Sequence, residues 1–243
     1  MGLEWEARHG VGVRLGETAT AAGVVALAPD VVVIATGATR DLPAVPGADL
    51  PHVWTGDSLR DAMTGRGSMP AAGRGARMVL GVARALRLTT SAARVRSLSR
   101  RWLPLGRRVC VLGGGLVGLE LAEFLAERGR SVTVLEHGPA AGLPMAAPRR
   151  WTAVRRAAAH GVDIAREATV VEITSDEVLY EVAGERRRVA ADAVVVAGEV
   201  RARAPLAAEL AELGLDVHVI GDAAEVGYIE GAIHSAWHVA RTI

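Results

Sequence analysis

The chain has 243 residues, of which 50% are hydrophobic and only 3% aromatic, so one large or two small domains must form around aliphatic cores. A formal net charge of +1 argues against a general nucleic-acid binder, and no apolar run approaches the ~18 residues of a membrane span, so we expect a cytoplasmic protein without a membrane span. The single cysteine, Cys110, excludes an internal disulfide, a CxxC redox pair and a cysteine-ligated iron–sulfur cluster, and it is predicted to be a small buried apolar residue.

Residues 1–63 predict the first part of a parallel α/β sheet. The segment GVGVRLGETAT predicts a short strand and turn, and AAGVVALA predicts a connecting segment. The run VVVIATGA has no polar alternation, so we expect a strand that is buried on both faces. It ends at Ala35, Thr36 and Gly37, at the carboxyl edge where open α/β sheets bind ligands. Prolines then indicate a crossover loop that leads to a short helix near 58–63.

Residues 64–106 form a predicted arginine-rich insertion. Between Ala62 and Leu119 the chain has eleven arginines and no acidic residue, and two short amphipathic helices are expected there. This pattern is typical of a solvated helical hairpin. It also fits a cationic docking surface for an acidic partner or a phosphorylated substrate and, less well, a membrane-surface segment.

Residues 107–136 have the order of a β-α-β unit that binds a dinucleotide: an apolar run, a glycine cluster, a helix-forming segment, a second apolar run and an acid. Gly113 permits a sharp turn after the strand, Gly115 leaves room for a pyrophosphate, and Gly118 lets the helix pack closely on the strand. The helix, which we expect to end near Glu127, would direct free N–H groups at the phosphates. The predicted binding residues at this turn are Gly113, Gly114, Gly115, Leu116, Val117 and Gly118. A tight strand–helix turn without a ligand is the alternative.

Glu136 lies 23 residues after Gly113, at the predicted tip of the second strand of this unit. A carboxylate there can accept hydrogen bonds from both ribose hydroxyls and would repel a 2′-phosphate. The next residue is His137 rather than an arginine. The sequence therefore favours NAD(H) over NADP(H).

The rest of the chain again alternates strands and helices. The predicted elements are a helix at 148–160, an antiparallel three-stranded meander that turns at Ala183-Gly184, a buried strand at 193–197, a helix near 204–213, the strand DVHVIGDA and a last helix at 230–242. Gly198 ends the buried strand much as Gly37 ends the earlier one, so both strand ends are candidate ligand positions.

Four strand-end motifs follow one another along the chain: ATG at 35–37, GGGLVGLE at 113–120, VVVAG at 194–198 and VIGDA at 219–223. In this order the chain resembles the two-dinucleotide-binding flavoproteins. It is most similar to the C-terminal FAD/NAD(P)-binding half of the 2,4-dienoyl-CoA reductase and trimethylamine dehydrogenase class of old-yellow-enzyme-like oxidoreductases, and LPAVPGAD, VWTGDSL and GYIEGAIHSAW also look like that family. The resemblance implies an α/β fold in which a Rossmann-like NAD(P)-binding domain is nested in an incomplete FAD-binding Rossmann-like domain.

The resemblance implies a role for several residues in binding FAD. Thr36 and Gly37 would lie along the cofactor, and Gly221 and Asp222 would form a flavin motif whose carboxylate accepts a hydrogen bond from the ribityl chain. The last helix, near Ile233, would point its N-terminus at the pyrimidine end of the flavin. For Asp222, a helix or turn cap is the alternative.

Three polar side chains have weaker functional interpretations. Glu120 would line the nicotinamide side of the site by resemblance, and a helix-surface acid is the alternative. His234 and His238 stand four residues apart on the last predicted helix, which is a spacing that metal ligands use. No third ligand is evident, so we expect helix-surface histidines and no metal site.

The predicted domains are a partial FAD-binding domain at 1–63 that returns at 201–243, the arginine-rich insertion at 64–106 and an NAD(P)-binding domain at 107–200. Upstream of Val31 the sequence has no strand–GxGxxG–helix of the kind that opens the family's FAD domain, and the family's catalytic TIM barrel is also not found. A sheet without its central strand exposes unpaired backbone groups. We therefore expect a partner domain or subunit that supplies this strand and the substrate site.

These observations favour a pyridine-nucleotide:flavin oxidoreductase module that passes hydride from NAD(P)H to FAD and electrons on to a partner. The cofactors supply the chemistry, so no catalytic side chain is assigned. The alternative is a redox-inactive fragment of a split flavoenzyme that binds an adenine nucleotide or only docks. A disulfide reductase is excluded because there is no second cysteine.

Overall fold

The computed structural model describes residues 10–56, 58–59, 103, 105–143, 145–198 and 200–243. The predicted helices of the arginine-rich insertion, and most of the predicted helix near 58–63, lie outside these residues. The chain forms two compact units, of which unit 1 comprises residues 1–39 and 201–243 and unit 2 comprises residues 40–200.

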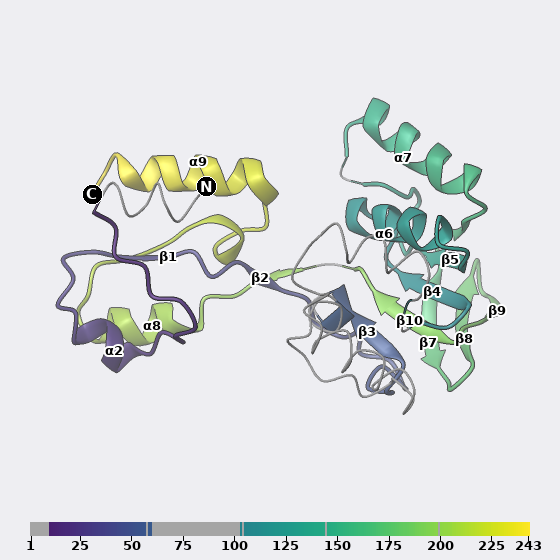
Figure 1. Ribbon diagram of the computed structural model, residues 1–243, viewed down its shortest axis with the longest axis horizontal. Helices are drawn as coiled ribbons and strands as arrows, with labels where there is room; N and C mark the ends of the chain where they lie inside the picture. Colours follow the sequence, from purple (N-terminus) through teal and green to yellow (C-terminus); the bar gives the residue numbers. More distant parts are fainter. Residues whose placement is uncertain (1–9, 57, 60–102, 104, 144, 199) are drawn as a thin grey trace, which may run out of the picture. The chain divides into compact units, whose positions relative to one another are not determined.

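Unit 2 is an α/β domain built on a five-stranded parallel sheet with the strand order β3-β10-β4-β5-β6 (Figure 1). Helices α6 and α7 pack on one face of this sheet, and the antiparallel meander β7-β8-β9 packs on the other. The structure thus confirms the predicted Rossmann-like fold. The elements are β3 (Val53–Thr55), β4 (Arg108–Leu112), α6 (Leu116–Ala126), β5 (Ser131–Leu135), α7 (Ala147–Ala159), β6 (Asp163–Ala165), β7 (Thr169–Ile173), β8 (Glu177–Val182), β9 (Glu185–Ala190) and β10 (Ala193–Val196).

Strand β4 shows why the sequence gives this layered core. Val109 and Val111 belong to the cluster that α6 and α7 cover, whereas Cys110 and Leu112 belong to the cluster under the meander. None of these four side chains is more than 6% exposed. A strand that is covered on both faces needs an apolar residue at every position, and this explains the absence of polar alternation in the run.

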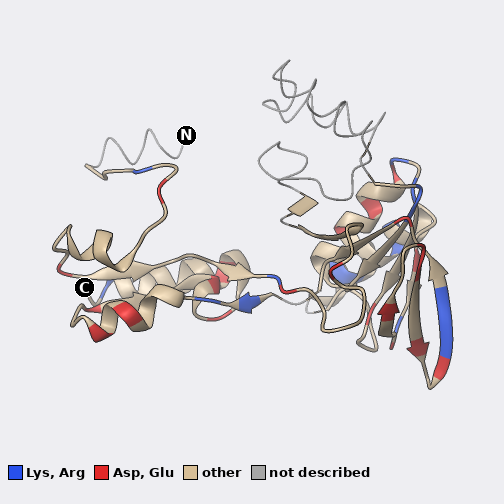
Figure 2. Cartoon of the chain, turned by 90° about the horizontal axis from the view of Figure 1, so that it is seen from below, with Lys and Arg blue, Asp and Glu red and all other residues tan. Residues whose placement is uncertain are grey.

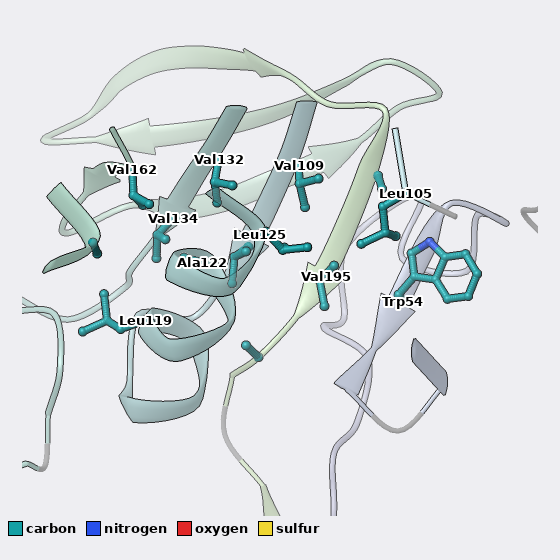
Figure 3. Packing of buried hydrophobic residues seen from close by; sticks show 14 of the residues in the cluster. Trp54, Leu105, Val109, Leu119, Ala122, Leu125, Val132, Val134, Val162 and Val195 are labelled. Atoms are coloured by element: carbon teal, nitrogen blue, oxygen red, sulfur yellow. The ribbon is translucent and has the colours of Figure 1, made fainter. Parts of the chain in front are cut away.

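On the helical side of the sheet, Leu119 and Leu125 of α6 point toward the valines of β4 and β5 (Figure 3). Both leucines are at most 1% exposed. Burying a leucine side chain contributes roughly 1.5–3 kcal/mol. The apolar face of α6 therefore fixes the position of the helix against the end of β4.

The meander turns where the sequence predicts, because Ala183 and Gly184 both have positive φ angles of 52° and 80°. Two such residues make the tight turn that suits the twist of a hairpin. The sequence also predicts that residues 162–174 form the first run of this meander, and this prediction is wrong in one respect. The run divides into β6, which joins the parallel sheet, and β7, which joins the meander, and Glu167 at φ 53° lies between them. Figure 2 shows the basic residues of β9, the outer strand of the meander, as a continuous blue stretch.

In unit 1, strand β1 pairs in parallel with β12, and β2 pairs antiparallel with β11. Ile34 of β1 packs in a small core with Ala21 of α2 and Leu210 of α8. The elements are α2 (Ala21–Val25), β1 (Val32–Ile34), β2 (Ala38–Thr39), β11 (Arg201–Ala202), α8 (Pro205–Glu212), β12 (Val217–Val219), the 3₁₀ turn η2 (Gly221–Ala223) and α9 (Tyr228–Ala240).

The beginning of the described chain differs from the prediction. Residues 11–20 form no strand, and the expected connecting segment contains helix α2 instead. The side chain of Thr20 accepts a hydrogen bond from Gly23 N and so caps this helix. The cap supplies the local signal for the helix, because a threonine before a short apolar run is a common helix start.

Strand β1 is covered on one face only, so the prediction of a strand buried on both faces is wrong for the residues described. Ile34 is 6% exposed, but Val33, which points to the opposite face, is 42% exposed. Helix α9 has no buried residue, and its Ile229, Ile233 and Trp237 are 79%, 61% and 57% exposed. These three residues are spaced four apart and therefore lie on one side of the helix. Unit 1 thus presents unusually exposed apolar side chains.

A contact at the start of β4 provides a test of stability against pH. The Asp192 carboxylate accepts hydrogen bonds from the Arg108 side chain and from the backbone N–H groups of Arg108 and Arg107. These bonds, the Arg108 side chain first, hold the pKa of Asp192 below its usual value. A lowered pKa adds stability above the unfolded-state value of about 3.9, and this stability is lost as the pH falls through the lowered folded-state pKa.

We therefore expect Asp192→Asn to lower the free energy of unfolding at pH 7 by about 1 kcal/mol. The difference from the parent chain should shrink as the pH falls below about 4, because the parent carboxyl then becomes neutral as well. Urea unfolding followed by circular dichroism at several pH values measures both effects. Asp163→Asn is the control, since this exposed carboxylate has no hydrogen bond or ion pair among the described residues. An effect of Asp192→Asn that persists unchanged at pH 2 would contradict this explanation.

Candidate functional site

The turn between β4 and α6 is shaped by two close approaches of the backbone. Gly113 has a φ of 103°, and a Cβ atom there would lie 2.7 Å from Cα of Gly198, at the end of β10. A Cβ at Gly118 would collide with the carbonyl oxygen of Gly113. Both positions therefore require glycine. The structure brings together Gly113, Gly118 and Gly198, which the sequence predicts as binding residues at the same sheet edge.

Gly115 is different, because a Cβ atom there would collide with nothing. The nearest atom that a Cβ there would meet is the Leu143 carbonyl oxygen at 3.4 Å, which is an ordinary contact distance. Gly115 is also the N-cap of α6, and no side chain caps this helix. The first N–H groups of a helix have no partner within it. The start of α6 therefore offers the N–H groups of Leu116, Val117 and Gly118 and a positive dipole end, which together suit an anion such as a pyrophosphate.

Glu136 follows β5 and turns its carboxylate back onto the glycine turn. Its Oε2 atom accepts a hydrogen bond from Gly114 N and its Oε1 atom accepts one from Gly138 N, both at 2.6 Å. Sequence reasoning predicted a ribose acceptor and missed this structural role. A carboxylate has about four lone-pair sites, so two hydroxyl groups can still be accepted. The geometry is thus compatible with ribose binding at the predicted residue.

Two other predicted residues of the α6 region are exposed. Val117, in the first turn, is 40% exposed. The Glu120 side chain is 61% exposed and lies 3.6 Å from the Arg149 guanidinium. An ion pair this exposed contributes little to stability. A role of Glu120 near a nicotinamide stays a prediction.

In unit 1, the predicted flavin residues lie at one sheet edge. Ile34 and Val219 are partners in register, and Ile220 N donates to the Ile34 carbonyl at 2.9 Å. Because β1 and β12 are parallel, the segment from Ala35 to Gly37 and the segment Gly221-Asp222 leave the sheet side by side. Gly37 and Gly221 have φ angles of 77° and 60°, so both chains turn sharply there. Parallel sheets bind ligands at this edge.

The carboxylate of Asp222 caps helix α9, as the alternative interpretation proposed. Its Oδ1 atom accepts hydrogen bonds from Gly227 N and Tyr228 N, both at 2.9 Å. The Oδ2 atom has no hydrogen bond within the part of the chain that the structure describes, so it can still accept one from a bound polyol. Capping and binding are therefore compatible at this residue. Ile233, also predicted, is 61% exposed on α9.

The histidine pair of α9 forms no metal cluster among the described residues. The group that the structure brings together is instead Glu123, Glu127 and His160, whose ligand atoms lie within 4.8 Å of one another. The Glu123 carboxylate is already held by the Arg156 guanidinium at 2.8 Å. An ion there would have to displace this arginine, so we assign these residues to a salt-bridge network between α6 and α7.

Comparison with known proteins identifies the class to which this fold and these glycine turns belong. The pyridine nucleotide-disulphide oxidoreductase profile matches residues 4–223, so the chain belongs to that family. An NADH oxidase from Thermoanaerobacter brockii is 30% identical over 238 residues, which are 97% of this chain and 31% of the relative.

Two solved structures agree with this assignment. A 2-naphthoyl-CoA reductase is 27% identical with a TM-score of 0.76, and the match covers 99% of this chain and 31% of that protein. A histamine dehydrogenase from Rhizobium sp. 4-9 has the same fold, with 21% identity, a TM-score of 0.69 and coverage of 96% and 33%. The predicted resemblance to old-yellow-enzyme-like flavoproteins is thereby confirmed, and the chain spans about a third of the length of these relatives. Within the described residues, no helix combines the length and the apolar character that crossing a membrane requires.

A substitution at Gly115 separates binding from folding. We expect Gly115→Trp to fold but to weaken NADH binding at least tenfold, because the indole would fill the space in front of the free N–H groups. Nucleotide titration followed by fluorescence, together with a thermal melt, measures the two effects. Ala159→Trp, at the exposed end of α7, controls for the added bulk. A Gly115→Trp protein that melts normally and binds NADH like the parent would contradict the site.

Cys110 gives a second test. Burial raises the pKa of its thiol to about 12, and the side chain is 0% exposed. The thiolate is the reactive form, so the native protein should not react with a thiol reagent over minutes at pH 8, whereas urea-unfolded protein should react at once. Absorbance of the released reporter measures the rate. Fast labelling of the folded chain would overturn the assignment of Cys110 as a core residue.

Proposed function

We propose that this chain is the dinucleotide-handling module of a flavin-linked oxidoreductase, in which unit 2 binds NAD(P)H and unit 1 forms part of an FAD site. The observation that carries the proposal is the open, uncapped start of α6 beside the Glu136 carboxylate. An anion-binding helix end and a ribose acceptor at the same sheet edge are the two parts that a dinucleotide needs.

The residues of unit 2 fit such a ligand. The N–H groups at the start of α6 would hold the pyrophosphate, and Glu136 would orient the adenosine ribose while it keeps the glycine turn in place. Gly113 lets the end of β4 approach Gly198 closely, and a Cβ at Gly198 would meet only the Leu112 carbonyl oxygen at 3.8 Å, so no side chain stands over the end of β10. A bound nicotinamide supplies a hydride, and a bound flavin accepts it. This chain's contribution is to orient the cofactors.

The residues of unit 1 fit part of a flavin site. Ala35, Thr36 and Gly37 lie beside Gly221 and Asp222 at the carboxyl edge of β1 and β12. Thr36 Oγ1 donates to the Arg203 carbonyl at 3.2 Å, which fixes the turn after β1. The free Oδ2 atom of Asp222 would accept a hydroxyl of the flavin side chain. A further domain or subunit would then bind the substrate and the electron acceptor.

The open side of β1 supports a partner that completes this sheet. Within the described residues β1 has a strand partner on one side only, and Val33 is 42% exposed. An unpaired strand edge next to exposed apolar side chains invites a further strand and its covering helix. We propose that a segment beyond the described sheet, in the same protein or in a partner, pairs with β1 and covers this face.

The names of the similar proteins support a redox function in general terms. The relatives described above are an NADH oxidase and a 2-naphthoyl-CoA reductase, and a bilirubin reductase from Mediterraneibacter gnavus is 29% identical over 88% of this chain. Each of them is similar to this chain, but their named activities differ. We therefore assign none of their named substrates to this chain.

A second candidate is a redox-inactive module that binds an adenine nucleotide or only docks. The observation that favours it is the incomplete cover of β1, because a half-open site would hold a flavin weakly. In this alternative, unit 2 still binds a nucleotide, but unit 1 does not bind FAD.

An absorbance spectrum of the purified chain, recorded with and without added FAD and then with NADH in the absence of oxygen, distinguishes the two candidates. For the leading function we expect retained flavin absorbance near ~450 nm that bleaches with NADH. Gly115→Trp should keep the flavin absorbance but slow the bleaching. Saturable NADH binding without retained flavin would favour the second candidate, and a monomeric, cooperatively melting chain would argue against the proposed partner strand.

A further inference from the structure

Unit 2 contains a cleft of about 430 Å³ between helix α7 and strand β6. Its floor is apolar and includes Val154 of α7 and Ile164 of β6. Two arginines, Arg150 and Arg166, line it together with Trp151. None of the sequence motifs pointed to this cleft.

The cleft borders the proposed adenosine end of the nucleotide site. Strands β5 and β6 run in parallel with Leu135 opposite Ala165, so the next residues along the two strands, Glu136 and Arg166, are neighbours. Glu136 N donates to the Ala165 carbonyl at 2.8 Å, as this register requires. The register then shifts by one residue, since Ala168 N rather than Glu167 N donates to the Glu136 carbonyl, at 2.9 Å.

Glu136 and Arg166 also lie on the same face of the sheet. Side chains alternate along a strand, so Glu136 shares the face of Val134, and Val134 belongs to the helix-side core. Arg166 lines the cleft under α7 together with Ile164, which packs against the same core. The acid that would accept the ribose hydroxyls therefore has an arginine at the matching position just past the end of the adjacent strand.

Glu136 and the two arginines of the cleft differ in whether their charged groups already have hydrogen-bond or ion-pair partners. The Glu136 carboxylate already accepts two backbone N–H groups at 2.6 Å, and the positive ends of these dipoles partly offset the field of its negative charge. Neither Arg150 nor Arg166 has an ion pair or a side-chain hydrogen bond among the described residues, whereas their neighbours Arg149 and Arg156 are paired with glutamates. Two uncommitted guanidinium groups beside a ribose-binding position are suited to a phosphate.

We propose that Arg166, with Arg150, receives the 2′-phosphate of NADP(H), so that the site of unit 2 accepts both NADH and NADPH in spite of Glu136. The inference rests on the proposed dinucleotide site and goes beyond it, because it names the residues that set the choice of cofactor. It bears directly on the expected NAD(H) preference, which rests on Glu136 and His137 and stays a prediction.

Binding of four ligands to the complete chain tests this assignment: NADH, NADPH, 5′-AMP and 2′,5′-ADP, each measured by calorimetry. The parent chain should bind NADPH within about tenfold of NADH, a difference of about 1.4 kcal/mol or less. Arg166→Gln should weaken NADPH and 2′,5′-ADP at least tenfold and leave NADH and 5′-AMP within twofold. Arg150→Gln should add to the loss. Added salt should weaken 2′,5′-ADP more than 5′-AMP, because charge attraction is screened.

Arg155→Gln is the matched control, since Arg155 is an exposed arginine of α7 that does not line the cleft. A fluorescence titration of the parent and Trp151→Phe chains reports whether the ligand lies at the cleft. The proposal is overturned if the parent binds NADPH more than about a hundredfold more weakly than NADH, about 2.7 kcal/mol, or if Arg166→Gln weakens both nucleotides alike. Failure of both nucleotides to bind a chain that melts normally would overturn the dinucleotide site itself, and this outcome is distinct from a failure of selectivity.

Discussion

The two hydrogen bonds of the Glu136 carboxylate are the contact on which the site of unit 2 depends. One oxygen holds Gly114 in the turn before α6, and the other holds Gly138 in the loop after β5. A single charged side chain thus fixes both the turn before α6 and the loop after β5. Hydrogen bonds to a charged group are roughly twice as strong as neutral ones, and the nearby positive end of α6 stabilises the carboxylate further. The free N–H groups at the start of α6 depend on this contact, because it fixes the turn that precedes them.

The same contact changes what an acid at this position means for cofactor choice. A free carboxylate would reject a 2′-phosphate by repulsion alone. Here the carboxylate accepts two backbone N–H groups, and Arg166 occupies the matching position just past the end of the adjacent strand. The choice between NAD(H) and NADP(H) then depends on the charges at the ends of two adjacent strands. Glu136 supplies only one of these charges. This is the physical basis on which we assign the choice of cofactor to the pair rather than to Glu136.

The parts of the fold that local pattern determines could be predicted from the sequence. The glycine turn, the doubly buried β4 and the hairpin at Ala183-Gly184 depend on residues close together in the chain, and the structure contains all three. Burial of β1 could not be predicted, because an apolar strand looks the same whether one face or both are covered. The proximity of Glu136 and Arg166 could not be predicted either. They are thirty positions apart in the sequence, and only the pairing of β5 with β6 brings them close. The double role of Glu136 and the cap at Asp222 likewise depend on where a side chain points.

The two units differ in how completely they bury their own apolar residues. Of the sixteen exposed large hydrophobic side chains among the described residues, twelve belong to unit 1. Unit 2 surrounds its sheet with helices on one side and a meander on the other, so its fold is explained by contacts within the chain. Unit 1 has a small core around Ile34 and an α9 whose apolar side faces outward. Leaving such surface in water forgoes about 25 cal/mol for each Å² that a partner could cover. The same exposed surface therefore destabilises the isolated unit and would add affinity for a strand that pairs with β1. For this reason we connect the open edge of β1 with a partner rather than with a defect of the fold.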